Sequence, residues 1–188
     1  MHSEHSLPLS LPHAHELRLG VDIGRVIIHG DGPDTSFVGG STEDALRAPA
    51  VDGALAALAR LQLRFAGRVW LVSKCGPKVQ SRTLAWFDRH RFFEATGLSR
   101  ERVRFCRDRR DKAPICEELG IALFVDDRRD VLEAMSGVVP YRFLFGSDSA
   151  PSADLIPVPG WCEAEAAILD TIDRLTPERS ETAMEQTR

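Results

Sequence analysis

The sequence lacks the features that mark several classes of protein. No apolar run approaches the roughly 20 residues that a helix needs to cross a bilayer, so we expect no membrane partner. Residues 1–16 contain no basic region followed by an apolar stretch, which a secretory signal requires. The four cysteines form no C-x-x-C pair and match no common zinc spacing. We therefore expect reduced thiols in a cytoplasmic protein.

The chain also lacks the excess of positive charge that non-specific nucleic-acid binding requires. Its formal net charge is -4, and its 43% hydrophobic and 28% charged residues are typical of a globular protein. Lysine is scarce, because only Lys74, Lys78 and Lys112 are lysines among the 24 basic residues. An ammonium group and a guanidinium group are not interchangeable at a point-charge site, so these three positions are candidates for specific roles.

Short apolar segments alternate with helical patterns along the chain. The predicted strands are residues 18–23, 68–73, 103–106, 122–125 and 141–145. The predicted helices are residues 53–64, 77–89, 114–119, 127–135 and 161–175. Strands that are apolar on both faces and separated by helices indicate an α/β fold with a doubly wound parallel sheet.

The length of 188 residues suits a single domain. We expect this domain to span residues 17–175, between flexible tails at 1–16 and 176–188. The stretch 29–50 is rich in Gly, Asp, Ser and Thr, and it is predicted to be a long loop or a very small lid.

Acidic side chains lie at the ends of two predicted strands. Asp22 follows the apolar residues 19–21, and Asp126 and Asp127 follow the apolar residues 122–125. Because the carboxyl ends of parallel strands form one edge of a sheet, where ligands bind, we expect the three acids to converge. Three carboxylates in one place repel each other unless a cation neutralises them, and such oxygen ligands suit magnesium. The sequence therefore predicts a Mg²⁺ site.

Two further motifs lie between these acids in the chain. Ser73 ends the predicted strand 68–73 and is followed by Lys74, and Lys112 stands just before a short predicted helix. Together with the acids they form four motifs in a fixed order. With these four motifs in this order, the chain resembles the haloacid dehalogenase-like (HAD) superfamily over about residues 17–146. Members of this superfamily are mostly phosphatases.

The resemblance implies phosphoryl transfer through an aspartyl-phosphate. A carboxylate nucleophile splits one difficult step into two, while a hydroxyl, an ammonium group and a metal ion stabilise the developing charge. The catalytic residues so implied are Asp22 as nucleophile, with Lys112 and Ser73. The substrate-binding residues so implied are Ser73, Lys74 and Lys112. The metal ligands so implied are Asp22, the backbone carbonyl of Gly24, Asp126 and Asp127.

Lys112 is expected to reach toward Asp22 and to stabilise both this carboxylate and a bound phosphate. Its replacement should then abolish activity or phosphate binding with little loss of stability. In isolation, each of these residues also has an ordinary structural explanation, since an aspartate at a strand end is often a turn former or a helix cap.

The chain departs from the pattern of the superfamily at Gly24. Phosphatases of this superfamily usually carry a second aspartate at this position, two residues after the nucleophile. This aspartate protonates the leaving group. Such general acid–base help is commonly worth roughly 10²–10⁴-fold, so an alkyl phosphate would be a poor substrate unless His29 or Asp31 supplies the proton. Two hypotheses follow: a magnesium-dependent phosphohydrolase that acts through Asp22, or a degenerate relative that binds phosphate or a phosphorylated partner without turnover.

The segments between the motifs leave room for little or no cap domain, so the site should be open to solvent and accept large substrates. The segment 100–110 contains six arginines and leads into Lys112. It is either a solvated face of mixed charge or a rim that attracts a polyanion. The candidate partners are a phosphorylated small molecule, a nucleotide, a nucleic-acid end or another macromolecule, and the oligomeric state is left open.

Overall fold

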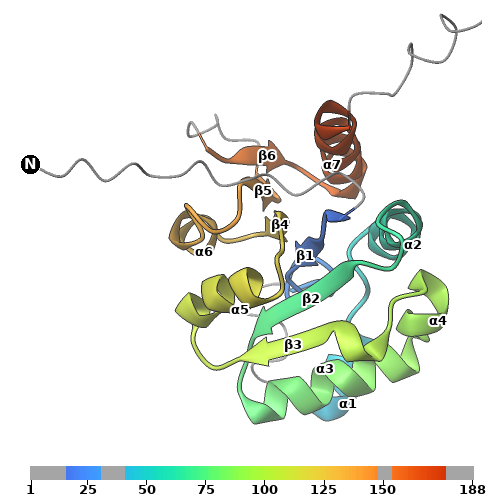
Figure 1. The fold of residues 1–188 in the computed structure, drawn as a ribbon. Coiled ribbons are helices and arrows are strands. Elements are labelled where there is room, and N and C mark those ends of the chain that lie inside the picture. Colours follow the sequence, from blue (N-terminus) through green and yellow to red (C-terminus); the bar gives the residue numbers. More distant parts are fainter. Residues whose placement is uncertain (1–15, 31–40, 148–153, 177–188) are drawn as a thin grey trace, which may run out of the picture.

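The computed structural model describes residues 16–30, 41–147 and 154–176, and it contains one parallel sheet with helices on both faces (Figure 1). The strand order is β3-β2-β1-β4-β5-β6. The strands are β1 (Leu19–Val21), β2 (Val69–Lys74), β3 (Val103–Cys106), β4 (Leu123–Asp126), β5 (Tyr141–Phe145) and β6 (Ile156–Val158). All neighbouring strands run parallel, as the alternation of strands and helices predicted.

Two hydrophobic clusters lie on opposite faces of this sheet. The helices are α1 (Thr42–Arg47), α2 (Ala54–Arg64), α3 (Pro77–Arg89), α4 (Phe92–Thr96), α5 (Lys112–Glu118), α6 (Arg129–Ala134) and α7 (Trp161–Leu175). The larger cluster includes Leu58, Trp86 and Trp161, from α2, α3 and α7. The smaller cluster includes Cys116 and Leu132, from α5 and α6. The sheet is therefore covered on both sides, and its strand ends form the accessible edge.

The parallel strands β1 and β4 lie in close contact at the centre of the sheet. Gly20 lies in the middle of β1, where a Cβ atom would come within 2.4 Å of the ring of Phe124. The absence of a side chain at Gly20 lets this aromatic ring pack over the strand. In the register of β1 and β4, Val21 lies opposite Val125. The residues that follow them, Asp22 and Asp126, therefore lie side by side.

The prediction of a long loop at 29–50 was wrong in part, because helix α1 lies within this stretch. Ser41 accepts a hydrogen bond from the Asp44 N–H at 3.1 Å, and its own N–H donates to the Asp44 carboxylate at 3.0 Å. This capping box satisfies backbone groups that a helix of six residues would otherwise leave exposed. Residues 31–40 of the predicted loop, and nearly all of the two predicted tails, lie outside the described residues.

Helix α4 and strand β6 were also not predicted. The short helix α4 follows α3 after Arg91, whose φ of 49° breaks the helical path. Strand β6 is only three residues long and contains Pro157, which is unusual in a strand interior. It pairs with β5 at the edge of the sheet, where a missing N–H is tolerated. No described helix is long and apolar enough to cross a membrane.

Candidate active site

The three predicted acids converge at the carboxyl edge of the central strands. Asp22 follows β1, and its N–H donates to the Val125 carbonyl of β4 at 2.9 Å. Asp126 ends β4, and Asp127 follows it. One carboxylate oxygen from each of the three acids lies within 4.8 Å of the others. Adjacent parallel strands of matched register thus bring together residues that are far apart in the sequence.

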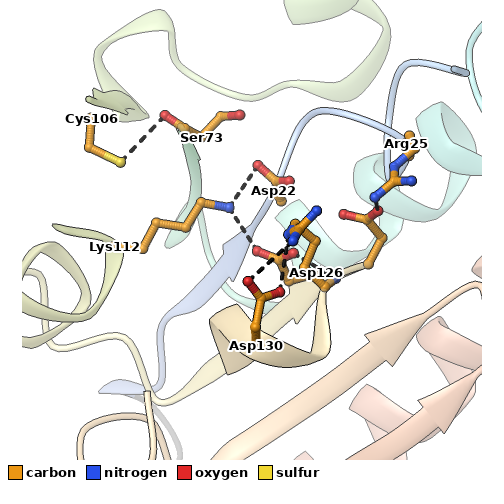
Figure 2. A network of polar contacts seen from close by, with 9 residues as sticks. Asp22, Arg25, Ser73, Cys106, Lys112, Asp126 and Asp130 are labelled. Carbon is orange, nitrogen blue, oxygen red and sulfur yellow. Dashed lines mark hydrogen bonds and ion pairs between the residues drawn. The ribbon is translucent and has the colours of Figure 1, made fainter. Parts of the chain in front are cut away.

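Lys112 lies between two of these acids (Figure 2). It is the first residue of α5 and is only 2% exposed. Its Nζ is 2.7 Å from Asp126 Oδ2 and 3.0 Å from Asp22 Oδ1. Burial alone would lower the pKa of Lys112, but the two carboxylates outweigh burial and raise it above its usual value. The ammonium group is therefore charged and fixed in position at neutral pH.

The two innermost carboxylates differ in how well their oxygens are satisfied. Asp126 is fully buried, and besides Lys112 it accepts a hydrogen bond from the Arg128 N–H at 2.9 Å. Asp22 Oδ1 is also buried, yet it accepts no hydrogen bond of normal geometry despite the nearby ammonium group. A buried carboxylate oxygen without such a partner is costly, which favours a further cation or donor at this place.

Burial and repulsion from Asp22 both raise the pKa values of Asp126 and Asp127. Burial raises the pKa of Asp126 to about 7, and repulsion from Asp22 adds to the effect while Lys112 opposes it. Burial also raises the pKa of Asp127, again with repulsion from Asp22, while Arg25 opposes it. These acids are easier to ionise when a hard divalent cation is bound between them. The donor set therefore fits Mg²⁺.

Arg25 is a member of the site that the sequence did not reveal. Its φ is 60°, a left-handed conformation that is uncommon for a residue with a long side chain. The tight turn is closed by a hydrogen bond from the Arg25 N–H to the Ile28 carbonyl at 2.8 Å. The turned backbone brings the guanidinium group into an ion pair with the carboxylate of Asp127. No local pattern signals this pairing, because the two residues are joined only by the fold.

A small cavity of about 230 Å³ opens beside these charged groups. Its lining contains most of the residues that the motifs predicted, namely Asp22, Gly24, Ser73, Lys74, Lys112 and Asp127. It also contains three arginines that were not assigned to the site, Arg25, Arg109 and Arg128. Asp126 lies beneath the lining, in contact with Lys112. The structure thus places all the predicted site residues together, while their chemical roles remain predictions.

Two thiols lie at the cavity on the β2–β3 side. Cys75 lines the cavity, and the Cys106 thiol donates to the Ser73 carbonyl at 3.8 Å, as Figure 2 shows. Burial raises the pKa of each thiol to about 11. Both are therefore protonated at neutral pH and are poor nucleophiles. This leaves the carboxylate of Asp22 as the better candidate nucleophile in the cavity.

The sequence named two candidate proton donors, His29 and Asp31. His29 is exposed and is not among the described residues that line it, and Asp31 lies outside the described residues. Gly24 lines the cavity, but it offers no side chain to donate a proton. Gly24 is not among the described glycines with a positive φ, so its backbone conformation suits other residues as well.

Comparisons with known proteins agree with this architecture. No protein-family model matches the sequence, and neither does any curated relative. Among solved structures, a haloacid dehalogenase-like family hydrolase from Xanthomonas campestris is similar with a TM-score of 0.55 and 12% identity, over 87% of this chain and 99% of that one. A haloacid dehalogenase-like hydrolase from Burkholderia xenovorans LB400 is similar with a TM-score of 0.56 and 14% identity, over 85% and 98% of the two chains. The chain therefore has the haloacid dehalogenase-like fold.

Proposed function

We propose that this protein is a magnesium-dependent phosphohydrolase that works through an aspartyl-phosphate at Asp22. The observation that carries the proposal is the buried arrangement of Lys112 between Asp22 and Asp126, beside a cavity at the carboxyl edge of the sheet. Taking these charges out of water is costly, and a fold does not need them for stability. A buried charge network of this kind at a cavity is typical of a catalytic site.

The residues suggest a mechanism in two steps. In the first step an Asp22 oxygen forms a bond to phosphorus, and the bond from phosphorus to the leaving oxygen breaks, so that this oxygen departs with the electron pair. In the second step water attacks the aspartyl-phosphate, which releases phosphate and regenerates the carboxylate. Lys112 holds Asp22 in place and neutralises charge on the phosphate oxygens, while the Ser73 hydroxyl donates to them.

The residues that would hold Mg²⁺ are Asp22, the Gly24 carbonyl and Asp126 or Asp127. The ion would neutralise negative charge that builds up on the transferred phosphoryl group. Lys112 already compensates part of the charge of Asp22 and Asp126. The site therefore does not depend on the ion alone to keep its carboxylates close together.

The glycine at position 24 limits which substrates can react well. With no acid there, the leaving group must depart as an anion, so aryl and acyl phosphates should react much faster than alkyl phosphates of similar size. We expect turnover to depend steeply on the pKa of the leaving group. Equal rates on an aryl and an alkyl phosphate would show that another residue supplies the proton.

The deciding experiment compares the parent protein with Asp22→Asn. Aryl phosphates, phosphorylated metabolites and nucleotides are incubated with Mg²⁺, and released phosphate is measured. The parent should turn over at least one aryl phosphate, and Asp22→Asn should lose activity by roughly 10⁴-fold or more, as is usual for a nucleophile. Asp22→Asn is close in shape to the parent, so circular dichroism should show the same fold.

Two results would contradict the proposal. Unchanged turnover in Asp22→Asn would exclude this residue as the nucleophile. Binding of phosphate by the parent without turnover of any substrate would favour the alternative, a degenerate relative that binds phosphate or a phosphorylated partner. Gly24 is the feature that supports this alternative.

A further inference from the structure

We infer that the substrate is a single-stranded nucleic acid whose terminal phosphate enters the cavity and whose following nucleotides lie along the β2–β3 side of the sheet. The binding surface, which we call the basic track, consists of Lys74, Arg102, Arg104 and Arg107. This inference rests on the proposed phosphohydrolase activity, because it names the substrate of that same site.

The size of the cavity places most of the substrate outside it. Pockets that enclose a drug-sized ligand usually measure about 300–1,000 Å³. A cavity of about 230 Å³ has room for a phosphate and a little more. Within the described residues, only the short helix α1 and the helix α2 separate β1 from β2, so no cap domain is seen over the site. The remainder of a larger substrate must therefore lie on the surface next to the cavity.

The charges beside the cavity favour one direction for that remainder. On the β4–β5 side each arginine already has an acidic neighbour: Arg128 pairs with Asp130 at 3.1 Å, and Arg129 lies 3.8 Å from Glu133. An anionic chain on that side would meet these carboxylates. A polyanion is therefore directed away from β4 and β5.

Two exposed cations on the β2–β3 side have no such neutralisation among the described residues. Lys74 lines the cavity at the end of β2, and neither Lys74 nor Arg107 has an ion-pair partner among the residues that the structure describes. Cys106, the last residue of β3, pairs in register with Lys74, so Arg107 follows β3 at the same edge of the sheet as Lys74. Two neighbouring cations without acidic partners repel each other, and a phosphate between them would relieve this repulsion.

The track continues along β3 as two guanidinium groups held against an indole ring. The guanidinium carbons of Arg102 and Arg104 lie 4.9 Å and 4.8 Å from the centre of the Trp70 ring. Trp70 is near the start of β2, about 13 Å from Lys74 at the rise of a strand. Contact with Trp70 limits the mobility of both side chains, and Arg104 is exposed, so a base could stack on its guanidinium group.

These features together select a nucleic acid rather than other polyanions. A phosphopeptide offers few phosphates and no row of flat rings, whereas single-stranded nucleic acid repeats a phosphate and a base along its length. The net charge of -4 for the whole chain argues against binding over the entire surface. Binding should instead be local and should depend on the end of the nucleic acid.

The test measures binding separately from turnover. Single-stranded oligothymidine of about eight nucleotides, with phosphate at either the 5′ or the 3′ end and a fluorophore at the other end, is titrated with Asp22→Asn protein in the presence of Mg²⁺. Fluorescence anisotropy gives the affinity without consuming the ligand. The same oligonucleotide with a terminal hydroxyl in place of the phosphate, a blunt duplex and a phosphopeptide serve as comparison ligands.

Arg104→Gln combined with Arg107→Gln removes two cations of the basic track. The matched control is Arg64→Gln combined with Arg174→Gln, which removes the same charge from exposed ion pairs with Asp173 and Asp170. The track variant should bind at least roughly tenfold more weakly and lower the slope of log affinity against log salt by roughly 1.4. The control should stay within about twofold of Asp22→Asn alone, because general electrostatics changes equally in both.

When Asp22 is kept, the protein with the two track substitutions should still turn over a small aryl phosphate. This turnover would show that the variant is folded. Several outcomes would overturn the inference: no binding of the oligonucleotide, equal losses in the track and control variants, tighter binding of the duplex or the phosphopeptide, or no preference for a terminal phosphate. If small substrates are not turned over but the oligonucleotide binds as expected, then the proposed activity fails and the binding surface stands.

Discussion

The charged groups on one side of the cavity have ion-pair partners, whereas Lys74 on the other side has none among the described residues. On the β1–β4 side, Lys112 pairs with Asp22 and Asp126, and Arg25 pairs with Asp127. On the β2–β3 side, Lys74 has no acidic partner among the described residues. The first side is arranged before any ligand arrives, which suits groups that act on the reacting atoms. On the second side Lys74 and Arg107 are exposed, so they are accessible to a ligand.

The sharpest way to test this difference is to remove one lysine from each side. Lys112→Met leaves two buried carboxylates without their cation, so we expect a loss of roughly 3–5 kcal/mol in the free energy of unfolding and no measurable turnover. Lys74→Met removes an exposed cation, and we expect a change within about 0.5 kcal/mol. Urea titration of both proteins gives the two values. Similar values for both variants would remove the distinction between the two sides.

This expectation differs from the one that the sequence suggests for Lys112. From the motif alone, a phosphate-binding lysine should be replaceable with little loss of stability. Its 2% exposure and its contacts with two buried carboxylates change that expectation, because burial makes the ion pairs interdependent. Burial of a lysine cannot be read from a local pattern, since it depends on how α5 packs against β2 and β4.

The second prediction concerns an acid introduced at position 24, on the β1–β4 side of the cavity. Gly24→Asp should narrow the difference in rate between aryl and alkyl phosphates, by up to roughly 10²–10⁴-fold, because a proton can then reach the leaving group. The backbone conformation at Gly24 is not one that requires glycine. The measurement is kcat/KM for one aryl and one alkyl phosphate in both proteins. Gly24→Asn has a side chain of the same size without the acid, and it should leave the difference unchanged.

The third prediction concerns Mg²⁺ and pH. Burial raises the pKa of Asp126 to about 7, above the value of about 3.9 that is usual in an unfolded chain. The folded protein therefore binds more protons than the unfolded chain between these values, so without metal its stability should fall as pH rises from about 4 to about 7. Mg²⁺ favours the ionised acids and should oppose this loss, by roughly 1.4 kcal/mol at ten times its Kd.

Thermal unfolding with and without MgCl₂, at about pH 5 and about pH 7.5, tests this prediction. The increase in Tm should be larger at the higher pH, where protons compete less with the metal. Asp126→Asn should lose most of the increase. An equal increase at both pH values, or one that survives in Asp126→Asn, would show that Mg²⁺ acts at another place.

The smallest expected effect concerns the thiols on the β2–β3 side. Although Lys74 and Arg107 favour the thiolate of Cys75, burial dominates and raises its pKa to about 11. Iodoacetamide at neutral pH should therefore modify the exposed Cys162 and leave Cys75 and Cys106 unmodified. Mass spectrometry of tryptic peptides gives the extent at each site. Fast modification of Cys75 would show that the cavity edge opens more than the structure indicates.

Much of the site could be predicted because its parts lie at the ends of strongly apolar strands. Asp22, Ser73 and Asp126 each come at or directly after such a strand, and parallel strands bring their carboxyl ends to one edge. The helix α1 could also have been found, since Ser41 and Asp44 form a capping-box pattern. The composition of the surrounding stretch, rich in turn-forming residues, concealed it.

Other features could not be predicted from local patterns. The ion pair between Arg25 and Asp127 depends on a left-handed residue and on the pairing of β1 with β4. The contacts of Arg102 and Arg104 with Trp70 depend on the register of β2 and β3. In each case the contact joins segments that are far apart in the sequence, so no periodicity in the sequence reports it. The sequence indicated the cations in the segment 100–110 but not which of them lack partners.

The position of β3 at the edge of the sheet has a consequence for aggregation. A free edge strand can pair with a strand of another molecule, and charged side chains on the edge prevent this. Arg104 is exposed on β3, while the opposite edge strand β6 is short and contains Pro157, which cannot donate a backbone hydrogen bond. The two ends of the sheet are thus protected by different means. The arginine that we place under a nucleic acid therefore has a second effect, because its charge on the edge strand also opposes pairing between separate molecules.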